Sequence, residues 1–406
     1  MPSAAPVSPL SILPRCRACN SSKLWPYFDL GAQPLANALR APGDVTPEFT
    51  APLAIQRCHT CGLSQLTHHV APAQLYNNYV FRAGTTTSWH RHCQDLVRLI
   101  DNWYENSGLV VDVGANDGTL LHHFQAAGYR VLGVDPAGCA DDDIPMHTAL
   151  WNNDAAQIIE ATEGEAMVVT AQNVFGHAAN PVDFLAAIKR ILAPNGTVVI
   201  EVPMVTSLVD NLAFDTIYHE HLYYWALTPL RLVARRVELD VVGVESLPHM
   251  HNGSMRIFLR HAGLKASDSV ARWEAWEQTW GLPERKPYIT FAARAQRALA
   301  LLCEMLGTFA VQGKTVWAYG ASAKLTVLLN ALKVPHPVEC VVDDTLAKQA
   351  MLMPGVAVPI IAPRSLRDVD VLLVGARNWL VDIREQAEAL DFRGKFLIPL
   401  PQPELL

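Results

Sequence analysis

Short apolar runs alternate with amphipathic stretches along most of the chain after residue 85. Apolar residues at helical spacing, with Thr87 or Ser88 as an N-cap, predict a helix that ends near Trp103. The runs that follow are apolar on both faces and are separated by helical stretches, which is typical of a parallel sheet covered on both sides. The predicted strands are 109–113, 130–135, 166–171, 197–202, 241–246 and 254–260, and the predicted helices are 181–192 and one starting near 228.

A second α/β pattern begins after a polar stretch. Residues 262–285 are polar and predict a boundary, and residues 291–311 have the spacing of a long helix. Further predicted strands are 315–320, 339–344, 370–375 and 396–401. Residues 1–80, by contrast, are rich in proline, carry four cysteines and show no long amphipathic helix. We therefore predict an α/β protein with a cysteine-containing module at 1–80, a Rossmann-like domain at 81–262 and a second Rossmann-like domain at 263–406.

Composition limits the classes of partner. The chain has 406 residues, which suits two or three domains. Its net charge of −7 argues against a general nucleic-acid binder, which needs a basic face. No apolar stretch approaches the roughly 20 residues that span a bilayer, and the N-terminus lacks the basic and then apolar pattern of a signal peptide. We expect a cytoplasmic protein that binds no membrane and keeps its thiols reduced, with monomer and dimer both open.

Two pairs of cysteines have the spacing of a metal site. Cys16 and Cys19, and likewise Cys58 and Cys61, are separated by two residues, so that each pair can present two thiolates from one tight turn. The 38 residues between the pairs require an inserted loop or extra strands. The alternative is a set of buried cysteines without a metal. Because four thiolates complete a tetrahedron and leave no open position, we predict a structural zinc ion.

A glycine-rich turn follows the predicted strand 109–113. Gly114, Asn116, Asp117 and Gly118 let a ligand approach the backbone, and the helix that follows offers free amide groups. An acid in this turn repels phosphate and favours a cationic ligand, unlike the turn of a dinucleotide site. Asp135 ends the next strand, where it can accept both hydroxyls of a ribose. The arrangement resembles the S-adenosylmethionine site of class I methyltransferases, with an altered NAD site and an empty turn as alternatives.

Three more polar residues belong to this predicted cofactor site. Gln172 and Asn173 follow the strand 166–171 and are predicted to line the pocket near the methyl group. Asp112 lies inside the strand before the turn, and we expect its carboxylate to orient the amides of the turn.

Four consecutive residues from 218 to 221 combine a phenol, two imidazoles and a carboxylate. In an extended segment Tyr218 and Glu220 share one side, whereas in a helical turn Tyr218 and His221 come together. The alternatives are catalysis, a metal site at His219 and His221, and a buried polar cluster.

The chain as a whole resembles the nucleotide-sugar C-methyltransferases, which methylate C-3 of dTDP-4-keto-6-deoxyhexoses. The matching segments are DLGAQPLAN (29–37), RCHTCGLSQL (57–66), VDVGANDGTLL (111–121), FDTIYHEH (214–221), HNGSMRIF (251–258), YGASAK (319–324), the region from VVDD to PG (341–355) and FLIPLPQP (396–403). The resemblance implies S-adenosylmethionine as the cofactor and a nucleotide-linked keto-sugar as the substrate. Removal of the C-3 proton, made acidic by the 4-keto group, would give an enolate that attacks the methyl group.

The resemblance also implies roles for particular side chains. His221 matches the general base, because a neutral imidazole can accept a proton near pH 7. Tyr218 and Glu220 match its partners, the phenol at the developing enolate oxygen and the carboxylate at an imidazole or the sugar. Tyr79 matches the region of a further active-site tyrosine, although Phe81 can occupy that position instead.

Substrate-binding residues are expected in the last third of the chain. The residues predicted to bind the sugar, its diphosphate or the nucleoside are Ser254, Arg256, Gly320, Ser322, Lys324 and Asp343. The chain departs from the family pattern at Met204, Asn252 and Arg377, all near the presumed substrate. Other readings are an O- or N-methyltransferase, a non-catalytic protein that binds the cofactor, and an NAD-dependent sugar oxidoreductase.

Overall fold

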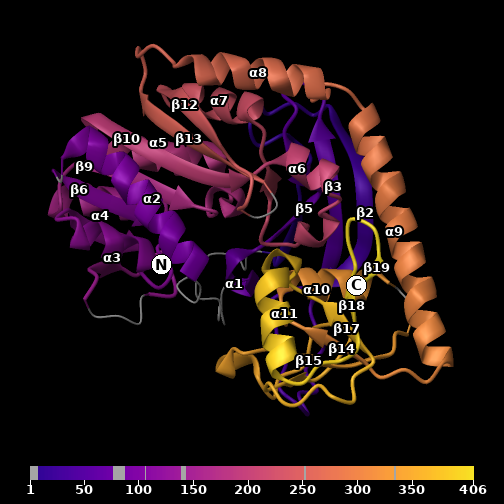
Figure 1. Cartoon of the computed structure of the whole chain (residues 1–406). Helices are drawn as coiled ribbons and strands as arrows, with labels where there is room; N and C mark the ends of the chain where they lie inside the picture. Colours follow the sequence, from indigo (N-terminus) through magenta and orange to yellow (C-terminus); the bar gives the residue numbers. More distant parts are fainter. Residues whose placement is uncertain (1–7, 76–86, 106, 139–142, 251–252, 333–334) are drawn as a thin grey trace.

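The computed structural model describes residues 8–75, 87–105, 107–138, 143–250, 253–332 and 335–406 (Figure 1). It has the mixed α/β fold that the sequence predicts, with one sheet in each of the three predicted parts and a short strand pair at the N-terminal end. The short pair joins β1 (Leu10–Ile12) to β5 (His68–Val70), and α1 (Pro72–Leu75) follows it.

The central sheet has the strand order β12-β13-β10-β9-β6-β7-β8. Strands β6 to β10 are parallel, and β13 and β12 continue the sheet in antiparallel fashion beside β10. The strands are β6 (Leu109–Val113), β7 (Arg130–Val134), β8 (Met146–His147), β9 (Ala166–Gln172), β10 (Leu192–Pro203), β12 (Leu239–Leu247) and β13 (Ser254–His261). The accompanying helices are α2 (Thr87–Tyr104), α3 (Thr119–Ala126), α4 (Asn153–Thr162), α5 (Pro181–Ile191), α6 (Val205–Asp210) and α7 (Leu227–Arg236), with short turns η1 (Phe175–His177) and η2 (Phe214–Thr216). All residues of β6 are buried, including Asp112, as expected for a strand covered on both faces of the sheet.

The N-terminal sheet contains one strand from the middle of the chain. Its order is β11-β4-β3-β2, and all its pairings are antiparallel. The strands are β2 (Leu24–Pro34), β3 (Thr50–Cys58), β4 (Ser64–Leu66) and β11 (Tyr223–Tyr224). The predicted insertion between the two cysteine pairs is therefore formed by β2 and β3. Because β11 begins two residues after His221, this sheet also anchors the segment 218–221.

The C-terminal sheet is parallel except at one edge. Its order is β16-β15-β14-β17-β18-β19, with β19 antiparallel to β18. Its elements are β14 (Val316–Tyr319), α10 (Ala323–Ala331), β15 (Val338–Val342), η3 (Leu346–Lys348), β16 (Ile360–Ile361), β17 (Val371–Val374), η4 (Arg377–Trp379), α11 (Leu380–Ala389), β18 (Lys395–Ile398) and β19 (Glu404–Leu405).

The polar stretch predicted as a boundary contains a helix. α8 (Asp268–Trp280) packs on β12 and α7, and α9 (Lys286–Val311) then runs from α8 past β2 toward the C-terminal sheet (Figure 1). α8 is held by a buried carboxylate as well as by apolar contacts. Glu277 accepts hydrogen bonds from the amides of Leu227 and Thr228 at 2.5 and 3.0 Å, which caps the start of α7. Among the described helices, none combines the length and apolar character that crossing a bilayer requires.

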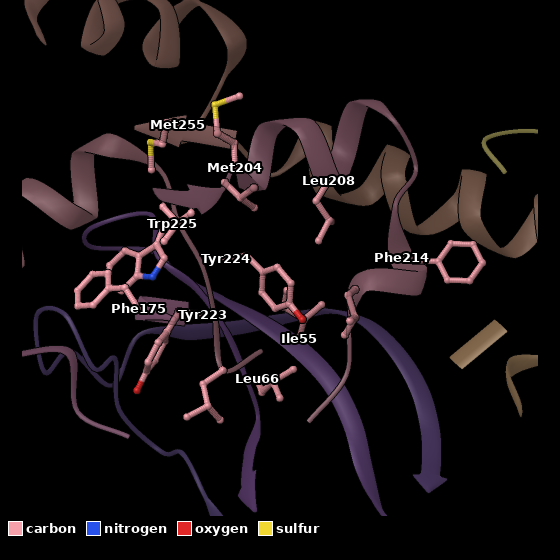
Figure 2. Packing of buried hydrophobic residues seen from close by; sticks show 14 of the residues in the cluster. Ile55, Leu66, Phe175, Met204, Leu208, Phe214, Tyr223, Tyr224, Trp225 and Met255 are labelled. Carbon is pink, nitrogen blue, oxygen red and sulfur yellow. The ribbon is translucent and has the colours of Figure 1, made fainter. Parts of the chain in front are cut away.

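A shared hydrophobic core joins the N-terminal sheet to the central sheet. Figure 2 shows Ile55 and Leu66 of the N-terminal sheet near the Tyr224 ring, and all three belong to one cluster of buried hydrophobic residues with Trp225. Trp225 stacks on Phe175 with ring centroids 4.7 Å apart. The two sheets therefore pack as one unit around the segment that carries the predicted catalytic residues.

Candidate active site

The four predicted zinc ligands lie together in the N-terminal module. The Sγ atoms of Cys16 and Cys61 are 3.5 Å apart, as are those of Cys19 and Cys58, and all four sulfurs lie within 4.8 Å of one another. Zinc–thiolate bonds of about 2.3 Å place the sulfurs of a tetrahedral site about 3.8 Å apart. The four thiols and the distances between their sulfur atoms therefore fit a zinc ion that joins the two cysteine pairs.

The predicted cofactor turn connects β6 to α3 in a left-handed conformation. Gly114, Asn116 and Gly118 have φ values of 77°, 52° and 75°. A Cβ atom at Gly114 would lie 2.8 Å from the Val174 side chain, so the turn can pack this closely against Val174 only with glycine at this position. Asp117 accepts a hydrogen bond from the Thr119 hydroxyl at 2.6 Å, which braces the start of α3. The turn therefore lies at the carboxyl end of β6, with a backbone conformation that its glycines allow.

The acid that supports this turn is Asp135, and not Asp112 as predicted. Asp135 accepts from the amides of Asn116 and Ala137 at 3.0 and 2.9 Å. Asp112 projects from its strand toward its neighbour in the sheet and accepts from the Thr170 hydroxyl at 2.6 Å. Burial raises the pKa of Asp112 to about 7.

A buried polar cluster that the sequence analysis missed lies beside the turn. Glu201, near the end of β10, accepts from His92 at 2.7 Å and from Arg256 at 2.6 Å. With its amide nitrogen turned toward Glu201, Gln172 donates to both carboxylate oxygens at 3.0 and 2.7 Å. Burial opposes ionisation of Glu201, but the hydrogen bond from His92 and the charge of Arg256 outweigh it and lower its pKa. The backbone amide of Asn173 donates to the backbone carbonyl of Glu201 at 2.9 Å.

This cluster bears on the predicted roles of Arg256 and Ser254. The Arg256 guanidinium is held by Glu201 and by Glu245, the latter at 3.4 Å, and the Ser254 hydroxyl donates to the Met250 carbonyl at 3.1 Å. The predicted substrate contacts of both residues stay predictions. Asn173 Oδ1, in contrast, is buried without a hydrogen-bond partner within the described residues, as an acceptor for a cationic ligand group would be.

Residues 218–221 form a turn and not an extended strand. The His221 amide donates to the Tyr218 carbonyl at 2.9 Å, and the rings of Tyr218 and His221 lie 3.9 Å apart. Nδ1 of His221 donates to the Thr216 carbonyl at 2.8 Å, which fixes the tautomer and leaves Nε2 as the acceptor nitrogen. His177, which the sequence analysis missed, has its ring 5.0 Å from that of His221.

The two intervening residues point into the N-terminal module. His219 donates from Nε2 to the Ala51 carbonyl at 3.2 Å, and Asn37 donates to Glu220 at 2.9 Å. Both side chains are buried, and burial lowers the pKa of His219 to about 4 and raises that of Glu220. His219 and His221 therefore serve different partners, and within the described ranges only the four cysteines cluster as metal ligands do. Tyr79 and Phe81 lie outside the described residues.

The predicted nucleotide-binding turn starts at the end of β14. Ser322 caps α10 by accepting from the Leu325 amide at 3.2 Å, just after Gly320, whose φ is 88°. Lys324 is half-buried in the first turn of α10 beside Asp215 of η2, and partial removal from water lowers its pKa to about 8. Asp343 accepts from the Ala321 amide at 2.7 Å and from Lys348 at 3.4 Å, so its carboxylate supports the turn. The structure thus brings Lys324 to the catalytic segment, while Asp343 is engaged within its own sheet.

Family models match three consecutive parts of the chain. Residues 16–76 match one described as "Putative zinc binding domain", residues 87–244 one described as a methyltransferase domain, and residues 249–401 one described as a C-methyltransferase C-terminal domain. C-methyltransferase NovU of Streptomyces niveus is 32% identical over 408 residues, covering 96% of this chain and 96% of the relative.

Solved structures match smaller portions. The 1,6-didemethyltoxoflavin-N1-methyltransferase of Burkholderia thailandensis, solved with S-adenosylhomocysteine, is 16% identical over 43% of this chain and 78% of its own, with a TM-score of 0.33. The CcbJ methyltransferase of Streptomyces caelestis is 14% identical over 47% of this chain and 96% of its own, with a TM-score of 0.32.

The assignment rests on the match to NovU along nearly the whole chain and on the three family models. The four clustered thiols and the glycine-containing left-handed turn after β6 agree with it. The chain therefore belongs to the S-adenosylmethionine-dependent C-methyltransferase family, with a zinc-binding module at its N-terminal end.

Proposed function

We propose that the protein methylates C-3 of a nucleotide-linked 4-keto-6-deoxy sugar. The observation that supports this most directly is the 2.8 Å hydrogen bond from Nδ1 of His221 to the Thr216 carbonyl. It leaves Nε2 to accept a proton from carbon, which carbon methylation next to a ketone requires. In this proposal residues 1–80 hold zinc, residues 81–262 hold the cofactor and residues 263–406 hold the nucleotide.

The site residues divide the work as follows. Nε2 of His221 takes the C-3 proton, and the electron pair of the broken C–H bond passes into the enolate. The Tyr218 hydroxyl donates to the developing enolate oxygen, with Glu220 and Asn37 holding the turn. Bound S-adenosylmethionine supplies an electrophilic methyl group, which the C-3 carbanion equivalent accepts as the sulfur–methyl bond breaks. Burial lowers the pKa of His177 to about 4, so this neighbour stays neutral and does not reduce the proton affinity of His221.

Labelled methyl transfer tests the substrate class. The protein would be incubated with methyl-labelled S-adenosylmethionine and a panel of dTDP- and GDP-linked 4-keto-6-deoxy sugars, and the products analysed by mass spectrometry. We expect one labelled methyl group at C-3 of at least one sugar. Transfer to no member of the panel, with S-adenosylhomocysteine still bound, would overturn this substrate class.

Asp135→Ala should weaken binding of S-adenosylhomocysteine about 10- to 100-fold, as measured by calorimetry. The substitution removes the acceptor of the predicted ribose hydrogen bonds and the acceptor of the Asn116 amide, and hydrogen bonds to charged groups contribute about 1.5–3 kcal/mol each. Asp154→Ala, at an exposed position on α4, is the matched control and should leave the affinity unchanged. Equal affinities for wild type and Asp135→Ala would remove Asp135 from the cofactor site.

Binding of dTDP or GDP should weaken above about pH 8. Lys324 carries its charge below its lowered pKa of about 8 and loses it above, so attraction for a diphosphate falls by up to about tenfold per pH unit. Lys324→Arg keeps its charge and should bind equally well up to pH 9.5. A wild-type affinity that does not change between pH 7 and pH 9.5 would contradict a role of Lys324 in diphosphate binding.

A further inference from the structure

The short turn η2 determines where the acceptor for the His221 ring lies. The Thr216 carbonyl, the last of η2, accepts from Nδ1 of His221 at 2.8 Å and from the Tyr224 hydroxyl at 3.3 Å. If this carbonyl moved, Nδ1 would lose its partner, and the other tautomer would place the proton on Nε2, where it blocks proton acceptance. The position of η2 therefore decides whether His221 can act as a base.

A buried ion pair from the C-terminal sheet holds η2 in place. Arg377, on η4 after β17, donates from Nη2 to Asp215 at 3.3 Å and from Nη1 to the Asn211 carbonyl at 3.4 Å. The side chains of Arg377 and Asp215 are only 9% and 5% exposed, so water screens their attraction little. The Arg377 guanidinium therefore binds both η2 and the residues that precede it.

Besides the ion pair with Arg377, η2 is held by contacts of Phe214 and Thr216, and Lys324 of α10 lies beside Asp215. The Phe214 ring packs 5.8 Å from Phe28 of the N-terminal sheet, and the Thr216 hydroxyl donates to the Ala213 carbonyl at 2.7 Å. These contacts hold the start of the turn and close it. Asp215 lies between Phe214 and Thr216 in the sequence. Its ion pair with Arg377 therefore holds the residue that directly precedes Thr216, whose carbonyl accepts from His221.

We propose that Arg377 and Asp215 are positioning residues that keep His221 in the Nδ1–H tautomer. The C-terminal sheet then contributes to the methyl-transfer site through η2, in addition to any contact with substrate. Only the role of His221 as base rests on the proposed function, because the tautomer can be measured without a substrate. The competing reading is that Arg377 binds the substrate diphosphate directly, and it predicts different results for the two variants below.

Nitrogen NMR of the zinc-loaded protein with bound S-adenosylhomocysteine and labelled histidine tests the proposal. The spectrum of His221→Gln identifies the His221 signals. We expect protonated Nδ1 in wild type, and a mixture of tautomers in both Asp215→Asn and Arg377→Gln, with the double variant no worse than either. Arg367→Gln breaks the exposed pair of Arg367 and Asp391, which are 3.3 Å apart, and serves as the matched control that should resemble wild type. Unchanged His221 signals in both folded variants would overturn the proposal.

Kinetics with any accepted sugar separates positioning from direct binding. We expect kcat to fall about 10- to 100-fold in both variants while KM changes less than twofold, because a small misplacement of a catalytic group affects the rate and not the affinity. Arg377→Lys should recover part of kcat. A KM that rises in Arg377→Gln but not in Asp215→Asn would instead assign Arg377 to the diphosphate. If the panel contains no substrate, the substrate class fails while the NMR result still decides on the ion pair.

Discussion

Replacing His221 with alanine is expected to lower the rate of methyl transfer by about 100- to 10,000-fold, the usual contribution of a general base. The residue is half-buried beside Tyr218, and its Nε2 is the acceptor nitrogen of a tautomer fixed by the Thr216 carbonyl. His177 cannot replace it well, because its low pKa makes it a poor proton acceptor. The rate of label transfer from S-adenosylmethionine at saturating substrate measures the effect.

Two further measurements show whether the lower rate of His221→Ala comes from the missing base and not from a loss of cofactor binding or of zinc. The affinity for S-adenosylhomocysteine and the zinc content of His221→Ala should equal those of wild type, because the substitution changes neither the turn after β6 nor the four cysteines. His261→Ala is the matched control, since His261 also bonds a carbonyl, that of Leu192 at 3.1 Å, but lies at the far end of β13. A His221→Ala protein that keeps more than a tenth of the rate would exclude His221 as the base.

Much of the fold could be predicted because its signals are local. The central strands are mostly apolar runs, and each predicted one overlaps an observed strand. The zinc ligands could be found because two Cys-x-x-Cys turns carry their geometry within four residues each. The cofactor turn was similarly visible, since Gly114, Asn116 and Gly118 are residue types that adopt positive φ readily.

Features that depend on distant residues could not be predicted. The sequence around His177 does not indicate that this residue lies beside His221. The sequence around Glu201 likewise does not indicate its contacts with His92 and Gln172. The assignment of Asp112 to the turn was wrong because strand geometry turns its side chain toward Thr170. α8 was missed because Glu277, a charged residue, provides one of its main contacts.

The N-terminal module contacts the catalytic segment directly. β11, directly after His221, pairs with β4, and His219 and Glu220 bond to Ala51 and Asn37 of the module. The cofactor turn, in contrast, belongs to the central sheet, whose strands in the described part of the chain all lie between residues 109 and 261. Damage to the module should therefore reach catalysis before it reaches cofactor binding.

Loss of zinc is expected to abolish methyl transfer while binding of S-adenosylhomocysteine survives in part. Cys58→Ser removes one of four clustered thiols at a fully buried position, and in small modules structural zinc contributes on the order of 10 kcal/mol to folding. Without it the sheet β2–β3–β4 loses the link between its two cysteine turns, and β11 loses its support. We expect a rate at least about 100-fold lower, with the affinity for S-adenosylhomocysteine reduced less than about tenfold.

Cys303→Ser is the matched control for this substitution. Its thiol is half-buried on α9, donates to the Leu332 carbonyl at 3.6 Å and lies outside the zinc cluster. Zinc content by atomic spectroscopy, the rate of label transfer and the affinity for S-adenosylhomocysteine would be measured on both variants. Equal loss of rate and cofactor affinity in Cys58→Ser would indicate global unfolding and refute the selective link through β11. A variant without zinc that keeps the wild-type rate would show that the module does not position the catalytic turn.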